Sequence, residues 1–209
     1  MKPKSRRFRA IRPATRRAAG AAAGLHSRAM SAAPFRIVPY DRAAHGGRPW
    51  RVVKAVFDEY GFPFDENGYD DDLLHPDAHY DGRTGWFAVA EDAAGRVIGT
   101  VGVSDEGGGR FELHRLYVLA EGRRAGAGSA LVAWAVAMAE AHGGRLMELY
   151  SDIAFEDAHR LYRRHGFRNH RFRYAPDPWA SREWGFVRSL GEGAGAPAGA
   201  ASAILEGRG

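Results

Sequence analysis

Apolar residues alternate with polar ones just after residue 34 and then take on a helical spacing. Residues 35–40 (FRIVPY) alternate and predict a first strand. Apolar residues recur every three or four positions over 50–60, which predicts a helix that ends at Gly61. Residues 70–80 predict a second, more polar helix, although Pro76 disfavours it.

The middle of the chain is rich in β-branched and aromatic residues that glycine turns interrupt. Residues 85–91 (GWFAVAE) and 97–104 (VIGTVGVS) predict two strands, and the short glycine-containing connection 92–96 predicts a hairpin. Three glycines at 107–109 predict another turn, and 111–118 (FELHRLYV) predicts the strand that follows it.

Helical and extended patterns alternate in the last third of this region. Residues 128–142 and 154–165 carry apolar residues at helical spacing, and glycine follows each of them directly. A strand is expected between them at 145–151, and two more around Phe172 and over 184–190. The predicted order, β-α-α-β-β-β-α-β-α-β-β, describes a mixed α/β fold in one domain, residues 34–190. A strand–helix–strand unit also predicts one parallel strand pair.

The two ends of the chain differ from this domain in composition. Residues 1–29 hold nine of the 30 Lys and Arg residues and no Asp or Glu. The whole chain has a formal net charge of +5, but the other 180 residues have 21 basic against 25 acidic residues, a net charge of −4. The predicted domain therefore gives no electrostatic reason to expect nucleic-acid binding.

Residues 1–33 are predicted to be a disordered basic tail, and three interpretations of it stay open. They are a transit peptide, a basic arm for nucleic acid or a membrane, and an extension upstream of a true start at Met30. Residues 191–209 are rich in Gly and Ala and are predicted to be a disordered tail.

Two absences from the sequence limit the chemistry and the location. The chain has no cysteine, which excludes disulfides, thiolate nucleophiles and cysteine-ligated metals. No apolar run approaches the ~20 residues that span a bilayer, so no membrane partner is expected. Together these features lead us to expect a cytoplasmic protein.

The segment 117–129 (YVLAEGRRAGAGS) carries the clearest chemical signal. A strand leads into a glycine-rich turn that opens a helix, and the free N–H groups of a first helical turn bind phosphate well. Gly126 and Gly128 let the backbone approach a pyrophosphate, and Arg123 and Arg124 add positive charge. The segment fits neither a Rossmann fingerprint, a P-loop nor a nucleophile elbow. A glycine-rich helix start without a ligand is the alternative.

Two motifs in this part of the chain resemble those of the GNAT N-acetyltransferase superfamily. Residues 123–128 (RRAGAG) match its R/Q-x-x-G-x-G/A motif, and they follow a strand as they do in that family. Residues 158–167 (AHRLYRRHGF) match A-x-x-L-Y-x-x-x-G-F at the expected distance. The resemblance covers about 35–190 and implies the GNAT fold.

The resemblance implies acetyl-CoA as a co-substrate and no metal. The backbone of 116–118 would line the pantetheine arm and the acyl group, and the amides of the glycine-rich turn would bind the pyrophosphate. The implied cofactor-binding residues are Leu116, Tyr117, Val118, Arg123, Arg124, Ala125, Gly126, Ala127, Gly128 and Ser129.

Tyr162 would be the general acid that reprotonates the CoA thiolate, because a phenol with a pKa near ~10 is protonated at neutral pH. A core tyrosine on an apolar helix face is the alternative. The sequence departs from the family pattern at Phe155, where Asn often binds the cofactor, and at Ala125, where a basic residue is common.

The acceptor amine needs a base, and Glu112 is the first candidate, with an exposed carboxylate as the alternative. His114 lies two residues further, hence on the same strand face. An acidic cluster could attract a cationic amine or simply form a solvated face. His75 and His79 have no evident third metal ligand. The acidic cluster consists of Asp65, Glu66, Asp70, Asp71 and Asp72.

The sequence therefore predicts an N-acetyltransferase that moves an acetyl group from acetyl-CoA to a primary amine of a small molecule or peptide. A non-catalytic acyl-CoA-binding sensor or partner module is the main alternative, and a nucleic-acid-associated protein acting through residues 1–29 is a third. The resemblance is also compatible with a homodimer.

Overall fold

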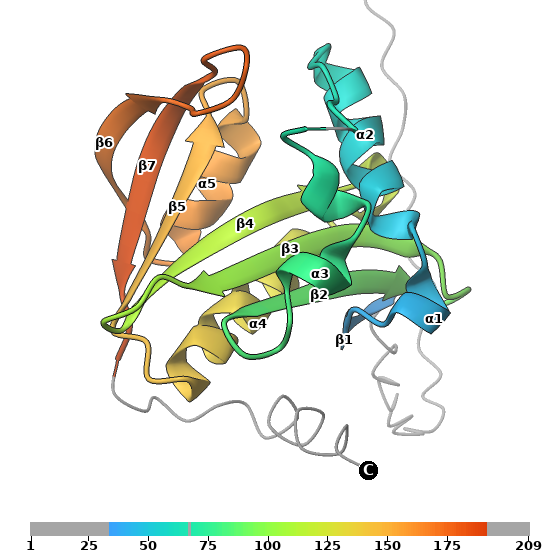
Figure 1. Ribbon diagram of the computed structural model, residues 1–209, viewed down its shortest axis with the longest axis horizontal. Coiled ribbons are helices and arrows are strands. Elements are labelled where there is room, and N and C mark those ends of the chain that lie inside the picture. The colour runs from blue at the N-terminus through green and yellow to red at the C-terminus, as the bar shows by residue number, and fades with distance from the viewer. Residues whose placement is uncertain (1–33, 67, 192–209) are drawn as a thin grey trace, which may run out of the picture. The chain divides into compact units, whose positions relative to one another are not determined.

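The computed structural model describes residues 34–66 and 68–191 (Figure 1). The predictions for residues 1–33 and for the tail beyond Gly191 lie outside the described residues. The elements are β1 (Phe35–Pro39), α1 (Arg42–His45), α2 (Arg48–Tyr60), η1 (Asp71–Leu73), α3 (Pro76–His79), β2 (Gly85–Asp92), β3 (Val97–Asp105), β4 (Arg110–Val118), η2 (Ala120–Gly122), α4 (Ala127–Ala141), β5 (Leu146–Asp152), α5 (Glu156–Arg164), β6 (Arg168–Tyr174) and β7 (Arg182–Ser189).

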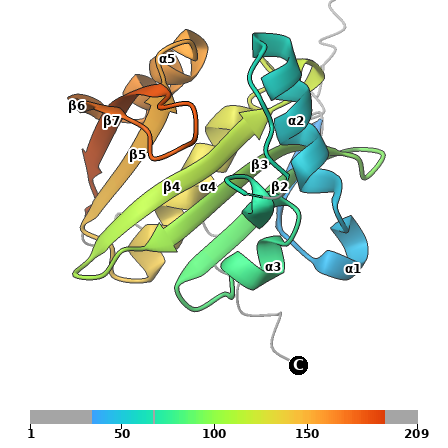
Figure 2. The ribbon, with the colours of Figure 1, turned by 45° about the horizontal axis from the view of Figure 1, so that its top comes forward.

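Seven strands form one mixed sheet in the order β1-β2-β3-β4-β5-β7-β6. β4 and β5 are parallel, and the other neighbouring strands of the described chain are antiparallel. One buried apolar cluster lies between the sheet and α4 and α5, and a second lies between the opposite face and α2. Figure 2 shows α2 and α3 on one side of the sheet and α4 on the other. The predicted mixed α/β fold and the parallel pair are confirmed.

β4 and β5 stop pairing well before either strand ends. Their register runs from Arg110 opposite Leu146 to Leu113 opposite Leu149, whereas β4 continues to Val118 and β5 to Asp152. The two strands diverge from this point, as Figure 1 shows. The later half of β4 therefore faces an opening on its β5 side, where its backbone groups have no strand partner.

A bulge in β4 marks the point of divergence. Arg115 and Leu116 together lie opposite the single residue Val101 of β3, and Arg115 has a positive φ of 49°. The hydroxyl of Thr100 donates to the Arg115 carbonyl at 2.7 Å and holds the bulge. Such a bulge bends a strand and increases its twist, which turns β4 away from β5.

The prediction of a single helix over residues 70–80 is wrong. The segment forms the 3₁₀ turn η1 and the separate four-residue helix α3, which begins at Pro76. Proline has no N–H to donate and favours an extended residue before it, and His75 has φ −130° and ψ 59°. The short helix α1 was not predicted. The Asp41 carboxylate caps it by accepting from the Ala44 amide at 2.6 Å.

None of the helices in the described part of the chain combines the length and the apolar character that crossing a membrane requires.

Candidate active site

The glycine-rich turn connects β4 to α4 and presents a run of unpaired backbone donors. The amides from Arg124 to Ser129 have no backbone or side-chain acceptor among the described residues. Gly126 precedes the helix in a left-handed conformation (φ 97°), and Arg124 also has a positive φ of 60°. Successive free amides at a helix start form a site suited to an anion with several oxygens.

Gly128 allows α5 to approach the start of α4. A Cβ at this position would lie 3.2 Å from Leu161 Cδ2 and 3.7 Å from Val118 Cγ2. The glycine is therefore needed for packing between the two motifs that carry the family resemblance. Ser129 and His165 add a contact of 2.7 Å between Oγ and Nε2.

The two arginines of the turn have different surroundings. Both Nη atoms of Arg123 donate to the Glu59 carboxylate at 2.6 Å, and its Nε donates to the Val118 carbonyl at 2.9 Å. Arg123 thus connects the turn to α2. Arg124 is exposed and has no ion-pair partner among the described residues, so its guanidinium remains free for an anion.

The residues of β4 beyond the bulge point alternately to the two faces of the sheet. Leu116 and Val118 pack with the core on the α4 side, and Tyr117 packs with the cluster under α2. Phe155, at the position where Asn was expected, contacts Tyr117 with ring centroids 6.1 Å apart. Phe155 also contacts aromatic rings of α2 and the segment after it: Tyr60 at 4.7 Å and Phe62 at 5.3 Å.

Tyr162 lies in α5 and belongs to the buried cluster between the sheet and α4 and α5, as the alternative interpretation of a core tyrosine expects. It is 4% exposed and packs against Phe167 and Phe186. Burial raises the pKa of the Tyr162 phenol, and a hydrogen bond with the Ser151 side chain opposes this effect. Ser151 belongs to the part of β5 that no longer pairs with β4.

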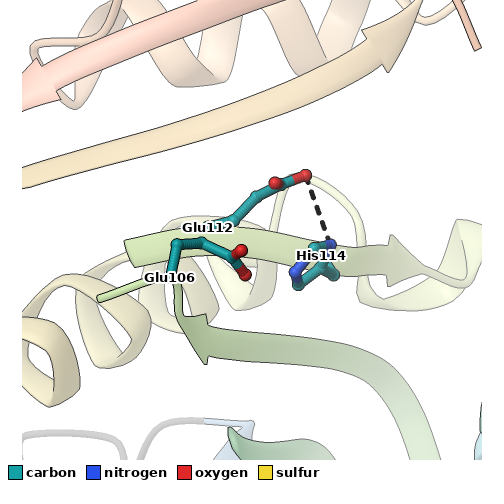
Figure 3. Close-up of side chains that lie close together, drawn as sticks. All are labelled: Glu106, Glu112 and His114. Atoms are coloured by element: carbon teal, nitrogen blue, oxygen red, sulfur yellow. Dashed lines mark ion pairs between the residues drawn. The ribbon is translucent and has the colours of Figure 1, made fainter. Parts of the chain in front are cut away.

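Glu112 projects from β4 just before the bulge, on the opposite face from Phe111 and Leu113 (Figure 3). Its side chain is 23% exposed. Burial raises the pKa of Glu112 to about 7, with Arg173 opposing the rise and nearby carboxylates adding to it. A carboxyl with this pKa can accept a proton from an amine near neutral pH.

A hydrogen-bonded chain, His114–Ser104–Glu106, begins beside Glu112 and ends at the exposed Glu106. His114 Nδ1 lies 3.5 Å from Glu112 Oε1, and His114 Nε2 lies 2.7 Å from the hydroxyl of Ser104. That hydroxyl donates to the Glu106 carboxylate at 2.6 Å. Burial, followed by the charge of Arg115, lowers the pKa of His114 to about 4, so the imidazole is neutral at pH 7. With its Nε2–H directed at Ser104, Nδ1 is left to accept from a protonated Glu112.

One group of potential metal ligands occurs among the described residues (Figure 3). It consists of Glu106, Glu112 and His114, whose donor atoms lie within 4.8 Å of one another. Ser104 bonds both His114 and Glu106, so the contacts present define a hydrogen-bonded chain. Of the two histidines considered as metal ligands, His79 has its Nε2 3.6 Å from Asp71 Oδ2.

The members of the acidic cluster differ in their surroundings: Glu66 is exposed, whereas Asp70 and Asp72 are paired. Asp70 is 0% exposed, and its Oδ1 lies 2.7 Å from Arg115 Nη1. Asp72 binds the same guanidinium at 2.6 Å and accepts from the Tyr80 hydroxyl at 3.1 Å. The two central carboxylates therefore neutralise the arginine of the bulge.

A cavity of about 340 Å³ lies over β4 and β5 and includes Glu112 in its wall. Sequence reasoning missed most of its polar lining, which comes from strands far apart in the chain. Besides Glu112, its charged and polar lining consists of Glu106, Arg110, Glu148, Tyr150, Arg171 and Arg173.

A mixed sheet with one parallel pair that opens, and a donor-rich helix start beside it, are features that this chain shares with acyltransferases. The sequence profile described as the Acetyltransferase (GNAT) family matches residues 50–167. The chain belongs to this family, and the resemblance predicted from the two motifs is confirmed.

The known relatives agree with this assignment. The chain is 31% identical over 132 residues to the aminoalkylphosphonate N-acetyltransferase of Salmonella typhimurium, which covers 59% of this chain and 78% of the relative. A GNAT-family acetyltransferase from Staphylococcus aureus shares the fold, with a TM-score of 0.65 at 18% identity over 75% of this chain and 99% of its own. A phosphinothricin acetyltransferase from Sinorhizobium meliloti, solved with AcCoA, has a TM-score of 0.58 at 21% identity over 78% and 92% of the two chains.

Proposed function

We propose that the protein moves the acetyl group of acetyl-CoA to a primary amine of a small molecule or peptide. The run of unpaired amides at the start of α4, next to the opening between β4 and β5, carries this proposal. A diphosphate matches such a helix start because its oxygens accept several N–H groups at once. The AcCoA in the Sinorhizobium meliloti structure and the amine acetylation in the name of the Salmonella relative support the donor and the reaction.

The donor would be held mainly by main-chain groups. The amides of 124–129 and the exposed Arg124 guanidinium would bind the diphosphate, and the backbone of 116–118 would accompany the pantetheine arm. Arg123 would act indirectly, because its pairing with Glu59 fixes the shape of the turn. Phe155 offers an aromatic surface where the resemblance led us to expect a hydrogen bond.

The candidate acid and base divide the proton transfers between them. The amine nitrogen attacks the thioester carbonyl, and Glu112 takes the proton that the nitrogen loses. When the carbon–sulfur bond breaks, the Tyr162 phenol gives a proton to the leaving thiolate. The chain His114–Ser104–Glu106 lets the proton on Glu112 pass toward solvent after each turnover.

Replacing Tyr162 by Phe tests this assignment. We expect kcat to fall by about 10²-fold or more, because a general acid contributes about that much. The dissociation constant of CoA should stay within about threefold, since the phenol makes no contact in the diphosphate site. Thiol release, measured over an amine panel that includes aminoalkylphosphonates, gives kcat, and titration calorimetry gives the CoA affinity.

The matched control is Tyr174→Phe, which removes a phenol that is 66% exposed on β6. An unchanged kcat in Tyr162→Phe would remove Tyr162 from the mechanism. CoA binding by the wild-type protein without turnover of any amine in the panel would instead identify a binding module.

A further inference from the structure

The cavity beside Glu112 receives two arginines from the far edge of the sheet. Arg171 and Arg173 belong to β6, and β7 separates them from Tyr150 of β5. Both guanidiniums nevertheless reach the Tyr150 ring, with carbon ζ 4.9 Å and 3.2 Å from its centroid. Cation–π contacts of this kind fix the position of an arginine without using its N–H groups.

A glycine in β7 makes this crossing possible. Gly185 lies in register between Tyr150 and Arg171. A Cβ on Gly185 would lie 2.9 Å from Arg171 Cγ and 3.0 Å from Tyr150 Cε1, closer than side-chain atoms pack. Because Gly185 has no side chain, Arg171 can lie across β7 and reach the cavity.

The carboxylates on this side of the cavity are already occupied. Glu148 binds the Tyr150 hydroxyl at 2.6 Å and Arg171 Nη2 at 2.8 Å, and Arg110 and His170 also contact it. Glu183 accepts from Arg173 Nε at 2.7 Å.

Several donors remain without a partner. Both Nη atoms of Arg173, and Nε and Nη1 of Arg171, have no acceptor among the described residues. The guanidiniums of Arg110, Arg171 and Arg173 line the cavity together with the carboxyls of Glu106, Glu112 and Glu148. The formal charges therefore balance, and the unpaired N–H groups of the arginines are the feature that an oxyanion would use.

We propose that the acceptor is a small amine that also carries an oxyanion, with its nitrogen at Glu112 and its oxyanion bound by Arg171 and Arg173. This inference rests on the proposed acetyl transfer and names the substrate class for that same site. A carboxylate, phosphate or phosphonate presents the paired oxygens that a guanidinium binds best. The cavity volume of about 340 Å³ suits a small molecule.

The test compares amines of similar length that differ in the group at the other end. The probes are propylamine, 3-aminopropanol, 1,3-diaminopropane, β-alanine and 2-aminoethyl phosphate, each assayed with acetyl-CoA. We expect kcat/KM to be at least about tenfold higher for the two anionic amines, mainly through KM, because charge-assisted hydrogen bonds are strong. A higher value for the phosphate than for the carboxylate, or the reverse, identifies which oxyanion the site prefers.

Variants on the same strand separate recognition from folding. Arg173→Gln should reduce kcat/KM at least about tenfold more for the anionic amines than for propylamine. Both are assayed well above the pKa of Glu112, because Arg173 also lowers that pKa and its removal affects every amine. Arg173→Lys should recover part of the loss because it restores the charge. Arg168→Gln is the control, since Arg168 is exposed at the start of β6 and lies outside the cavity lining. Arg171→Gln should act in the same way, but it also breaks the contact with Glu148 and could unfold the protein. If it does, the Arg173 variants alone decide whether the oxyanion site exists.

The outcomes separate this inference from the function on which it rests. Equal use of all five amines, or a preference for the diamine, would overturn the oxyanion site and leave acetyl transfer intact. If no amine is acetylated, calorimetry with 2-aminoethyl phosphate on the CoA-saturated protein decides instead. Binding that Arg173→Gln weakens supports the oxyanion site, and absence of binding overturns it.

Discussion

Burial acts on the two candidate proton-transfer groups with different consequences. For the Glu112 carboxyl it disfavours the anion and brings the pKa to about 7, where the group can take up and release protons. For the Tyr162 phenol it raises the pKa further above neutrality, so the proton stays on the oxygen until a strong base such as a thiolate appears. The same desolvation therefore suits one group to act as a base and the other as an acid.

The pKa of Glu112 predicts a pH dependence of the reaction. Because the base must be ionised, the pH profile of kcat/KM should show an inflection near pH 7, where its slope decreases. Glu112→Gln should remove this inflection and lower kcat/KM by about 10²-fold or more. Glu156→Gln is the control, since the Glu156 side chain is 76% exposed and pairs with Arg160 on the surface of α5. A wild-type profile without inflection between pH 6 and 8 would contradict the assignment of Glu112.

The ionisation of Glu112 should also make the free energy of unfolding depend on pH. The folded-state pKa of Glu112 lies above its ordinary value of 4.5, so the unfolded chain loses the proton first as pH rises. The contribution of Glu112 to the free energy of unfolding is therefore present below about pH 4.5 and is lost between 4.5 and 7. Glu112→Gln should raise the melting temperature relative to wild type at pH 8 and have less effect at pH 5, as calorimetric scans would show.

At the scale of elements, the start of α4 combines phosphate-binding geometry with close helix packing. Gly126 adopts the left-handed conformation that precedes the helix, and Gly128 leaves room for Leu161 of α5. One glycine-rich turn thus sets both the anion site and the position of α5, which carries Tyr162.

A larger residue at this contact should disturb both properties. Gly128→Val should lower the free energy of unfolding by about 1–3 kcal/mol, because the new side chain forces α5 away from α4. Urea unfolding measures the loss, and calorimetry should show weaker CoA binding. Ala133→Val places the same residue at an exposed position of α4 and should cost less than about 1 kcal/mol. Equal losses in the two variants would show that the Leu161 contact is unimportant.

At the scale of the whole molecule, the Arg115 guanidinium connects the loop before α3 to the sheet. It binds two carboxylates that lie more than forty positions earlier in the chain, and one of them, Asp70, is completely buried. The contact forms beside the bulge at which β4 leaves β5. It therefore ties the segment that covers this face of the sheet to the strand that borders the opening.

Breaking this connection should destabilise the protein strongly. Arg115→Met leaves Asp70 buried without its charge partner, and we expect a loss of about 3–5 kcal/mol in urea unfolding. Arg96→Met removes an exposed pair with Asp92 and should cost at most about 1 kcal/mol. The double variant Arg115→Met with Asp70→Asn should recover part of the loss. A cost for Arg115→Met no larger than that for Arg96→Met would contradict this account.

The sequence by itself determined the features that short-range spacing controls. The strand alternation, the helical periods of α2, α4 and α5 and the glycine turn at 126–128 all depend on residues within one or two turns of each other. The parallel pair followed from a strand–helix–strand order, and the family followed from two local motifs. The helix predicted over 70–80 shows the limit of such spacing, because Pro76 begins a separate short helix there.

Only the tertiary structure decided which charges meet. Asp70 binds Arg115 across 45 positions, and Arg171 reaches Tyr150 because the strand order places β7 between them with a glycine at the crossing. Nothing in the local sequence distinguishes these arginines from solvated ones, since their partners are fixed by sheet order and strand register. The pKa of Glu112 likewise depends on burial by distant strands, which a sequence pattern does not contain.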